Sequence, residues 1–274
     1  MGLAVVSRIL SLAAFAGVLL AQDAAQIIRK SVELDQANWL RARDYTWNVN
    51  RVERRLDSDG KVKSETREAW ETVILYGEPH RRYTLKDGKQ LSAADLRKQQ
   101  EKLDKETAKL RDETEQQKQR RLAETEKRRR KDREFLLEIP QAFNLHVDRE
   151  DRVEGRAVWV ISATPRPDYH PKRKEARDLM KIKGRLWIDK VEYQWVRIEA
   201  ETIDTLTWGI FIGRIHPGAK LMFEQTRIND EIWLPKHSTV QGSGRIVGKK
   251  IAIEEDVTWR NFRKFRVESN IIVE

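Results

Sequence analysis

The sequence predicts a mainly β fold of the α+β class, built on one antiparallel sheet with a long charged helical insertion. Short runs rich in Val, Ile and Trp are bounded by Gly, Pro, Asp or Lys, which is typical of strands and turns. Within several runs apolar and charged residues alternate, and one segment, residues 92–133, contains neither Gly nor Pro. Counting the runs gives about ten or eleven strands.

The first 21 residues have the features of a secretory signal peptide. Arg8 precedes an apolar run at residues 9–20, and a cleavage point follows Ala21. The run is shorter than the about 20 apolar residues that cross a bilayer as a helix. No Cys follows it, which excludes a lipid-modified N-terminus. We therefore expect a periplasmic protein, with an inner-membrane protein tethered by an uncleaved signal as the alternative.

Composition narrows the function classes. The chain has 0 cysteines, which excludes a disulfide framework, a thiolate zinc site and a Cys nucleophile and suits a bacterial periplasm. The formal charge is +10, from 54 basic residues interleaved with 44 acidic ones. Such a surface is typical of nucleic-acid binding, of contact with anionic lipid headgroups or of a soluble basic protein. Export argues against nucleic acid.

The N-terminal part predicts a helix followed by three strands. Apolar residues at helical spacing fill residues 23–39, and Asp23 is placed to cap the helix. Residues 45–53 and 61–76 form a hairpin around the turn at 57–60, and residues 81–85 form a third strand. After residues 1–21 we expect a single domain, 22–274, interrupted by the charged insertion at 92–133.

The charged insertion predicts a helix, and the sequence allows more than one arrangement for it. Residues 92–95 resemble a capping box, and Leu96, Leu103 and Leu110 repeat at sevens before the register fails at Gln117, which is too short a repeat for a coiled coil. A continuous helix would be about 63 Å long, and a hairpin or a frayed end are the alternatives.

Two functions fit this insertion. It is either a solvated charged helix held by its own ion pairs, or a docking arm for a protein partner or for anionic headgroups. The docking interpretation rests on the basic cluster Arg128, Arg129, Arg130 and Lys131.

The C-terminal part predicts a strand meander. Residues 135–143 are expected to continue the helix and pack on the sheet, with a mobile apolar lid as the alternative. Prolines remove backbone hydrogen-bond donors from residues 164–171 and restrict the residues that precede them. We therefore expect a loop there rather than a helix or a central strand. The expected strands are residues 144–151, 155–163, 184–189, 195–201, 202–215, 219–228, 232–235, 238–246 and 250–265.

Alternation indicates which side of the meander is buried. In residues 195–201, Val196, Ile198 and Ala200 are expected on one face and the charged residues on the other, since successive side chains of a strand face opposite sides. By the same parity Trp195 is expected to face outward. One face of the sheet therefore meets water and the other meets something apolar.

The sequence shows no catalytic constellation. The five histidines are scattered without metal-ligand spacing, and no HExxH, GxSxG or GxxxxGK[ST] motif is present. The carboxylates are spaced as on the solvent-exposed faces of strands, which does not indicate a catalytic pair. We expect no enzyme, no metal and no cofactor, and interpret the chain as a binding or structural module.

The order of strand motifs resembles a known family. The motifs are Gly155-Arg156 before residues 159–161, residues 163–167, the run Gly-Arg-Leu-Trp-Ile-Asp at 184–189, residues 223–225 and the run Ile-Trp-Leu-Pro at 232–235. Together they resemble the bacterial outer-membrane lipoprotein-sorting proteins and their LolA/LolB-like relatives, a superfamily that includes sensor domains of the RseB type. The likeness covers residues 135–265 and, less closely, 45–85, and it leaves out the charged insertion.

The resemblance implies a curved antiparallel sheet forming an incomplete barrel whose apolar side is covered by helices. It implies a non-enzymatic periplasmic carrier or binding protein for lipoprotein acyl chains or other lipids, and helices at 23–40 and 135–143 as the cover. The alternative is a protein-interaction or envelope-stress sensor module that uses the charged helix as its docking arm. Peripheral membrane contact is compatible with either function.

Candidate lining residues come from the strands. The favoured candidates for an apolar groove are Trp159, Val196, Ile198, Leu221 and Phe223. Both faces of residues 158–163 are apolar, so the sequence leaves open which of them is inside. Further candidates, each with a role in an ordinary core as its alternative, are Trp47, Trp70, Trp187, Trp195, Trp208, Trp233 and Trp259.

Overall fold

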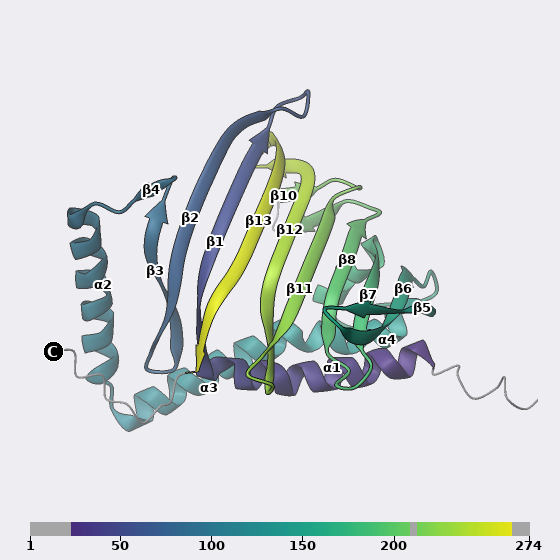
Figure 1. The fold of residues 1–274 in the computed structure, drawn as a ribbon, viewed down its shortest axis with the longest axis horizontal. Helices are drawn as coiled ribbons and strands as arrows, with labels where there is room; N and C mark the ends of the chain where they lie inside the picture. The colour runs from purple at the N-terminus through teal and green to yellow at the C-terminus, as the bar shows by residue number, and fades with distance from the viewer. Residues whose placement is uncertain (1–22, 209–212, 265–274) are drawn as a thin grey trace, which may run out of the picture.

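One 13-stranded antiparallel sheet dominates the computed structural model, which describes residues 23–208 and 213–264 (Figure 1). The expected signal peptide, residues 1–21, lies outside the described residues. The sheet does not close on itself, which confirms the expected incomplete barrel. The strand order is β4-β3-β2-β1-β13-β12-β11-β8-β7-β6-β5, with β10 paired to β12 and β9 paired to β10. The strands are β1 (Tyr45–Leu56), β2 (Val62–Leu75), β3 (Glu78–Lys86), β4 (Lys89–Gln90), β5 (Phe143–Val153), β6 (Arg156–Pro165), β7 (Ile182–Asp189), β8 (Trp195–Thr202), β9 (Leu206–Trp208), β10 (Gly213–Ile215), β11 (Lys220–Ile228), β12 (Ile232–Ile246) and β13 (Lys249–Lys264).

Two strand predictions need correction. Residues 202–215 do not form one strand, because β8 ends at Thr202 and the short strands β9 and β10 pair with each other. The Thr202 side chain accepts a hydrogen bond from the N–H of Ala219 at 3.0 Å and so fixes the start of the next strand. Residues 232–235 and 238–246 form one strand, β12, which passes through Pro235 at a register shift, where a proline does not interrupt a regular ladder.

The first helix, α1 (Ala24–Arg41), is confirmed where the apolar spacing predicts it. The Asp23 carboxylate caps it by accepting the N–H of Ala25 at 3.0 Å. Its apolar stripe, Ile27, Ile28 and Val32, is almost completely buried. The helix runs across the lower ends of the strands in Figure 1.

The charged insertion folds as two helices, α2 (Ala93–Arg111) and α3 (Glu115–Arg133), rather than as one straight helix. Ser92 caps α2 as expected, accepting the N–H of Asp95 at 3.1 Å. A second capping box, formed by Thr114 and Gln117, starts α3. Figure 1 shows α2 beside β3 and α3 returning below the strands next to α1.

The outer edge of β3 is covered by a side chain of α2. The Gln99 amide donates to the carbonyl of Tyr83 at 3.1 Å and accepts the N–H of Tyr83 at 2.8 Å. It thus replaces the hydrogen bonds that a neighbouring strand would make. Unpaired strand edges are templates for association with other chains, so α2 protects this one.

Short helical turns connect the insertion to the second half of the sheet. These are η2 (Ala42–Asp44), η3 (Glu134–Glu138), α4 (Ile139–Ala142) and η4 (Glu175–Lys181). Residues 135–143 pack on the sheet as expected, with Ile139, Ala142 and Phe143 in the core.

The proline-rich loop that follows β6 is held by a buried carboxylate. Glu138 accepts hydrogen bonds from the Tyr169 hydroxyl at 2.6 Å, the N–H of Lys172 at 3.0 Å and the N–H of Arg173 at 3.1 Å. Burial alone raises the pKa of Glu138, but these bonds outweigh it and the pKa lies below its usual value. Burial and the bond to Glu138 raise the pKa of Tyr169 to about 12.

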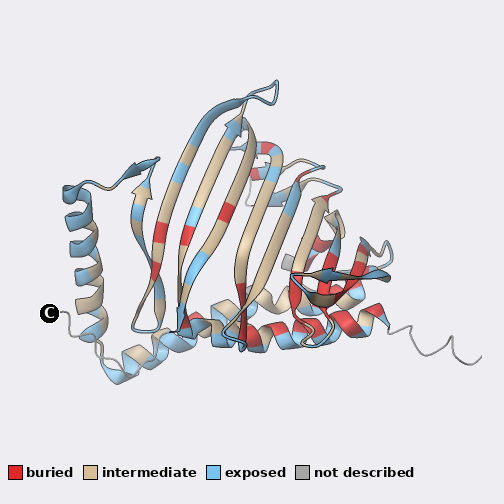
Figure 2. Ribbon diagram, in the orientation of Figure 1, coloured by how far each residue is buried: buried red, intermediate tan, exposed pale blue. Residues whose placement is uncertain are grey.

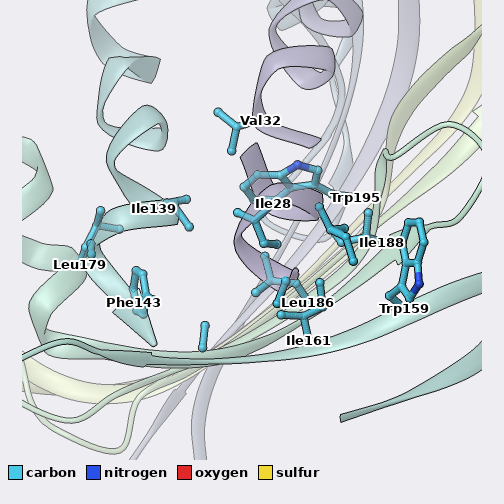
Figure 3. Close-up of a cluster of buried hydrophobic side chains, with 14 of the residues drawn as sticks. Ile28, Val32, Ile139, Phe143, Trp159, Ile161, Leu179, Leu186, Ile188 and Trp195 are labelled. Atoms are coloured by element: carbon cyan, nitrogen blue, oxygen red, sulfur yellow. The ribbon is translucent and has the colours of Figure 1, made fainter. Parts of the chain in front are cut away.

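The main core lies at one end of the sheet. It joins α1, α4 and η4 to strands β5 to β8 (Figure 3). Figure 2 shows that buried residues concentrate at this end, whereas the strands β1, β2, β11, β12 and β13 are mostly half-buried along their length. The helices therefore cover only part of the sheet.

Candidate lipid-binding face

The strand register places apolar side chains along one side of the sheet. We call the side on which α1 lies the inner face, and the opposite side the outer face. Cross-strand partners share a face, and one row of partners runs from Ile161 through Leu186 and Ile198 to Phe223. Because Ile161 and Leu186 belong to the core beneath α1, the whole row lies on the inner face.

A second row continues this surface to the far edge of the sheet. Val49 pairs with Trp70 on one side and Trp259 on the other, and Trp70 pairs with Tyr83. The rings of Phe223 and Trp259 meet edge to face at 6.5 Å, which joins the two rows. We call this surface the inner apolar band. Its members are Tyr83, Trp70, Val49, Trp259, Val257, Val240, Phe223, Leu221, Ala200 and Ile198.

Helices cover the inner face over β5 to β8, and this covered core meets the band at Ile198. The core over β5 to β8 contains Ala24, Ile27, Ile28 and Val32 of α1. By contrast, the cluster of Val49, Trp70 and Val257, each at most 7% exposed, has only strand residues among the hydrophobic side chains packed against it. Within the described ranges, 23–208 and 213–264, no helix residue belongs to this cluster or is among the hydrophobic residues packed against it. Leu221, in the middle of the band, is 40% exposed.

The outer face of the same strands is charged. Arg197 on β8 lies 3.6 Å from Glu224 on β11, and His237 on β12 lies 3.0 Å from Asp256 on β13. Such pairs suit a surface in contact with water, where they add little stability. The two faces of the central strands thus differ as in other antiparallel sheets with one solvated face.

A small apolar cluster interrupts the polar outer face. It comprises Val158, Val160, Trp187, Val196 and Trp233. Guanidinium groups lie over its edges: Arg197 is 5.2 Å from the Trp187 ring and Arg156 is 5.2 Å from the Trp233 ring. This cluster is therefore a satellite core.

Four of the five predicted lining residues lie on the inner face. Ile198, Leu221 and Phe223 belong to the inner apolar band, and Trp159 lies in the adjacent core beneath α1. The open question about residues 158–163 is answered as well, since Trp159 and Ile161 are inside and Val158 and Val160 outside.

Val196 is the exception, because it faces the outer cluster. The register between β7 and β8 shifts next to it, so that Ile188 pairs with Trp195 but Trp187 pairs with Arg197. Val196 is the extra residue of this bulge, and alternation fails at that point. The same shift turns Trp195 inward, against the expected outward orientation, into the core beneath α1.

Sequence reasoning missed part of the band. Val49, Val257 and Tyr83 were not candidates, although alternation in residues 45–53 already pairs Val49 with Trp47 on one side. What the alternation cannot indicate is that this strand lies next to the last strand, β13. Trp70 and Trp259 do line the band, as two of the further tryptophan candidates.

An ion-pair cluster borders the band on the inner face. Arg51 donates to Glu255 at 2.6 Å and to Glu68 at 3.2 Å, and it also bonds Glu53. Arg55 lies 3.4 Å from Glu53, so two guanidinium groups stand among three carboxylates and this border keeps a net negative charge.

The helix α1, which was predicted to be part of the cover, is attached to the sheet and to α3 by polar contacts. The Asn38 amide of α1 donates to the carbonyl of Trp233 at 2.7 Å and accepts its N–H at 2.9 Å, all within the buried interior. Asp35 of α1 pairs with Arg133 of α3, and burial outweighs this pair and raises the pKa of Asp35. These contacts attach the C-terminal half of α1 to the start of β12 and to α3, while its apolar stripe packs in the core over β5 to β8.

The predicted basic patch lies at the end of α3. Arg128, Arg130 and Lys131 are exposed, and none forms an ion pair with another residue of the described chain. Arg129 is half-buried and lies 5.8 Å from the Trp39 ring, so it packs against α1.

Structures of known proteins resemble this fold at low similarity. A putative outer membrane lipoprotein-sorting protein domain from Vibrio parahaemolyticus is 10% identical, with 89% of this chain and 95% of that chain covered and a TM-score of 0.35. A LolA superfamily protein from Nitrosomonas europaea is 10% identical, with coverages of 91% and 96% and a TM-score of 0.31. These neighbours are lipoprotein-sorting and LolA-superfamily proteins. The Pseudomonas aeruginosa MucA/MucB complex matches at 10% identity, coverages of 89% and 100% and a TM-score of 0.25.

No protein-family model and no curated protein matches the sequence. Because the TM-scores are below 0.5, the function of this chain is inferred from its own geometry. Within the described residues no helix is long and apolar enough to cross a membrane. The same residues contain no cluster of three potential metal ligands.

Proposed function

We propose that this chain is a non-enzymatic binding protein or carrier for acyl chains, of lipoproteins or of other lipids, in the periplasm of a bacterium. The observation that carries the proposal is the inner apolar band, which extends from Ile198, at the helix-covered core, to a cluster on β1, β2 and β13 that includes no residue of a described helix. Large contiguous apolar surfaces on a folded protein are typical of interaction sites, because exposing them to water is unfavourable. An acyl chain gains ~0.8 kcal/mol for each CH₂ that leaves water.

The size of the band supports an acyl chain as the ligand. Tyr83 and Ile198 lie on β3 and β8, which are separated by six strand spacings, or about 29 Å at ~4.8 Å each. One leaflet of a bilayer contributes about 15 Å to its hydrocarbon core. The band is therefore long enough for an extended acyl chain lying across the strands.

The test compares adjacent positions of β11. Leu221 and Phe223 face inward and Met222 faces outward. Residues 22–274 are purified, examined by lipid mass spectrometry for co-purified acyl chains, and titrated with a fluorescent fatty acid. We expect the double variant Leu221→Gln/Phe223→Gln to weaken binding about tenfold or more and Met222→Gln to leave it unchanged. Equal effects of the two variants, or no binding by the parent chain, would contradict the proposal.

A second candidate function is a protein-interaction module that uses α3 as its docking arm. It is favoured by the exposed side chains Arg128, Arg130 and Lys131, which lack carboxylate partners in the described structure. The triple variant Arg128→Glu/Arg130→Glu/Lys131→Glu is compared with the parent chain in a pull-down from periplasmic extract. A specific protein that is lost from the variant, while fatty-acid binding is retained, supports this function. Identical captured proteins argue against it.

A further inference from the structure

A cleft of about 950 Å³ lies between α2 and the β3–β4 hairpin. Its size is within the range of small-molecule sites. Two of its lining residues, Arg81 and Tyr83, sit on the inner face, because Arg81 pairs with Thr72 and Tyr83 with Trp70. A separate pocket lined by Arg82 and Thr84 lies on the outer side of α2. The larger cleft therefore opens toward the inner face.

The cleft joins the end of the inner apolar band. Tyr83 belongs to both, since it lines the cleft and its ring lies 5.8 Å from that of Trp70. The guanidinium of Arg81 lies over the same Trp70 ring at 4.5 Å. A cation thus stands where the apolar surface ends and the cleft begins.

The cleft carries an excess of unpaired positive charge. Arg81, Lys86, Lys89, Lys98 and Lys102 line it, and none of them forms an ion pair with any residue that the structure describes. Two of the three acidic lining residues are engaged: Glu106 lies 3.1 Å from His80, and Asp95 accepts from the Ser92 hydroxyl at 2.6 Å. Five cations without carboxylate partners among the described residues, all around one cleft, indicate a site for an anion.

We propose that the cleft binds the phosphate headgroup of an anionic lipid whose acyl chain lies on the inner apolar band. This rests on the proposed function and deepens it by naming the ligand class. Ammonium and guanidinium groups bind phosphate oxygens through charge-assisted hydrogen bonds. A lipid bound this way has its headgroup at the β3 edge, in the open cleft, and its hydrocarbon on the strands.

The test uses three probes that separate headgroup from chain. Lysophosphatidylglycerol carries both, a monoacylglycerol with the same acyl chain lacks the phosphate, and glycerol phosphate lacks the acyl chain. Their affinities are measured by calorimetry on residues 22–274. The variant Lys98→Gln/Lys102→Gln removes two charges from the cleft, and the matched control Lys105→Gln/Lys109→Gln removes two exposed charges of the same helix outside the cleft.

We expect the parent chain to bind lysophosphatidylglycerol about tenfold tighter than the monoacylglycerol. The cleft variant should lose most of this preference, whereas the control variant should keep it. Monoacylglycerol binding should not change in either variant.

Other results overturn the proposal in distinguishable ways. Equal affinity for the two acyl ligands overturns the headgroup site and leaves the acyl-chain function standing. Glycerol phosphate binding as tightly as lysophosphatidylglycerol assigns the cleft to free phosphate esters. Failure of both acyl ligands to bind overturns the proposed function together with the headgroup site.

Discussion

Gly184 shows how single residues permit the curvature of this sheet. It lies on the inner face of β7, and a Cβ atom at this position would stand 2.6 Å from the carbonyl oxygen of Glu199 on β8. Real Cβ atoms do not approach backbone oxygens this closely, so the two strands need glycine here. This explains why the motif at residues 184–189 begins with Gly.

We therefore expect Gly184→Ala to destabilise the fold by about 2 kcal/mol, because the strands must separate to admit the methyl group. Urea unfolding measures the change in the free energy of unfolding. Ser64→Ala, at an exposed strand position, is the control and should change it little. A Gly184→Ala variant as stable as the control would show that the strands adjust without cost.

Glu138 predicts sensitivity to acid. Its pKa is lowered in the folded chain, so its contribution to stability is complete above the unfolded pKa, near 4.5, and is lost as the pH falls through the folded pKa. Glu138→Gln should lower the free energy of unfolding at pH 7 by about 2 kcal/mol. The difference from the parent chain should shrink below pH 4.5. Urea unfolding across this pH range measures it, with the exposed Glu101→Gln as control; a difference independent of pH would exclude the mechanism.

At the scale of elements, two side-chain amides attach helices to strands in the same way. Asn38 of α1 bonds the N–H and the carbonyl of Trp233, and Gln99 of α2 bonds those of Tyr83. Each amide supplies one donor and one acceptor, which is what a strand residue offers its neighbour. The charged insertion is therefore part of the sheet's edge.

Gln99→Ala should expose this edge. We expect the Tyr83 amide to exchange its hydrogen about tenfold faster, because it loses its protein acceptor while β2 and β3 remain paired. Hydrogen exchange followed by NMR measures this rate. Gln100→Ala, whose amide bonds only Asp104 within the helix, should leave it unchanged. Unaltered exchange in Gln99→Ala would mean that packing of α2 alone protects the edge.

The sequence predicted most elements because their signals are local. Alternation and turn residues predicted the hairpin of β1 and β2, and Asp23 and Ser92 predicted the helix starts. The break before α3 also had a local signal, the capping box of Thr114 and Gln117, which was missed. The bulge at Val196 had none, since it depends on how β8 pairs with β7.

At the scale of the molecule, the extent of helical cover could not be predicted from the sequence. Apolar stripes indicate that α1 and α4 pack on the sheet, but not on which strands. Tertiary contacts such as Asn38 with Trp233 decide this, and they join residues far apart in the chain. Four of the five candidate lining residues therefore lie on the inner face, and their role in binding stays a prediction, while the part of the band next to β13 was not foreseen.

The inner apolar band predicts the kinetics of binding. Since no described helix must move to expose it, fatty-acid association should be a single step of about 10⁶ M⁻¹s⁻¹ or faster. In stopped-flow fluorescence the observed rate should rise linearly with protein concentration. A rate that levels off at high concentration would reveal a slow opening step, as expected of a mobile lid.

Both rims of the sheet are closed to strand addition. Gln99 occupies the rim at β3, and the rim at β5 carries a register shift and the charged residues Asp148, Arg149, Glu150 and Asp151, which discourage pairing. Copies of the chain therefore cannot extend the sheet into a ribbon. Under the proposed function, the surface left for two copies to share is the inner apolar band, so we expect dimerisation and lipid binding to compete for it.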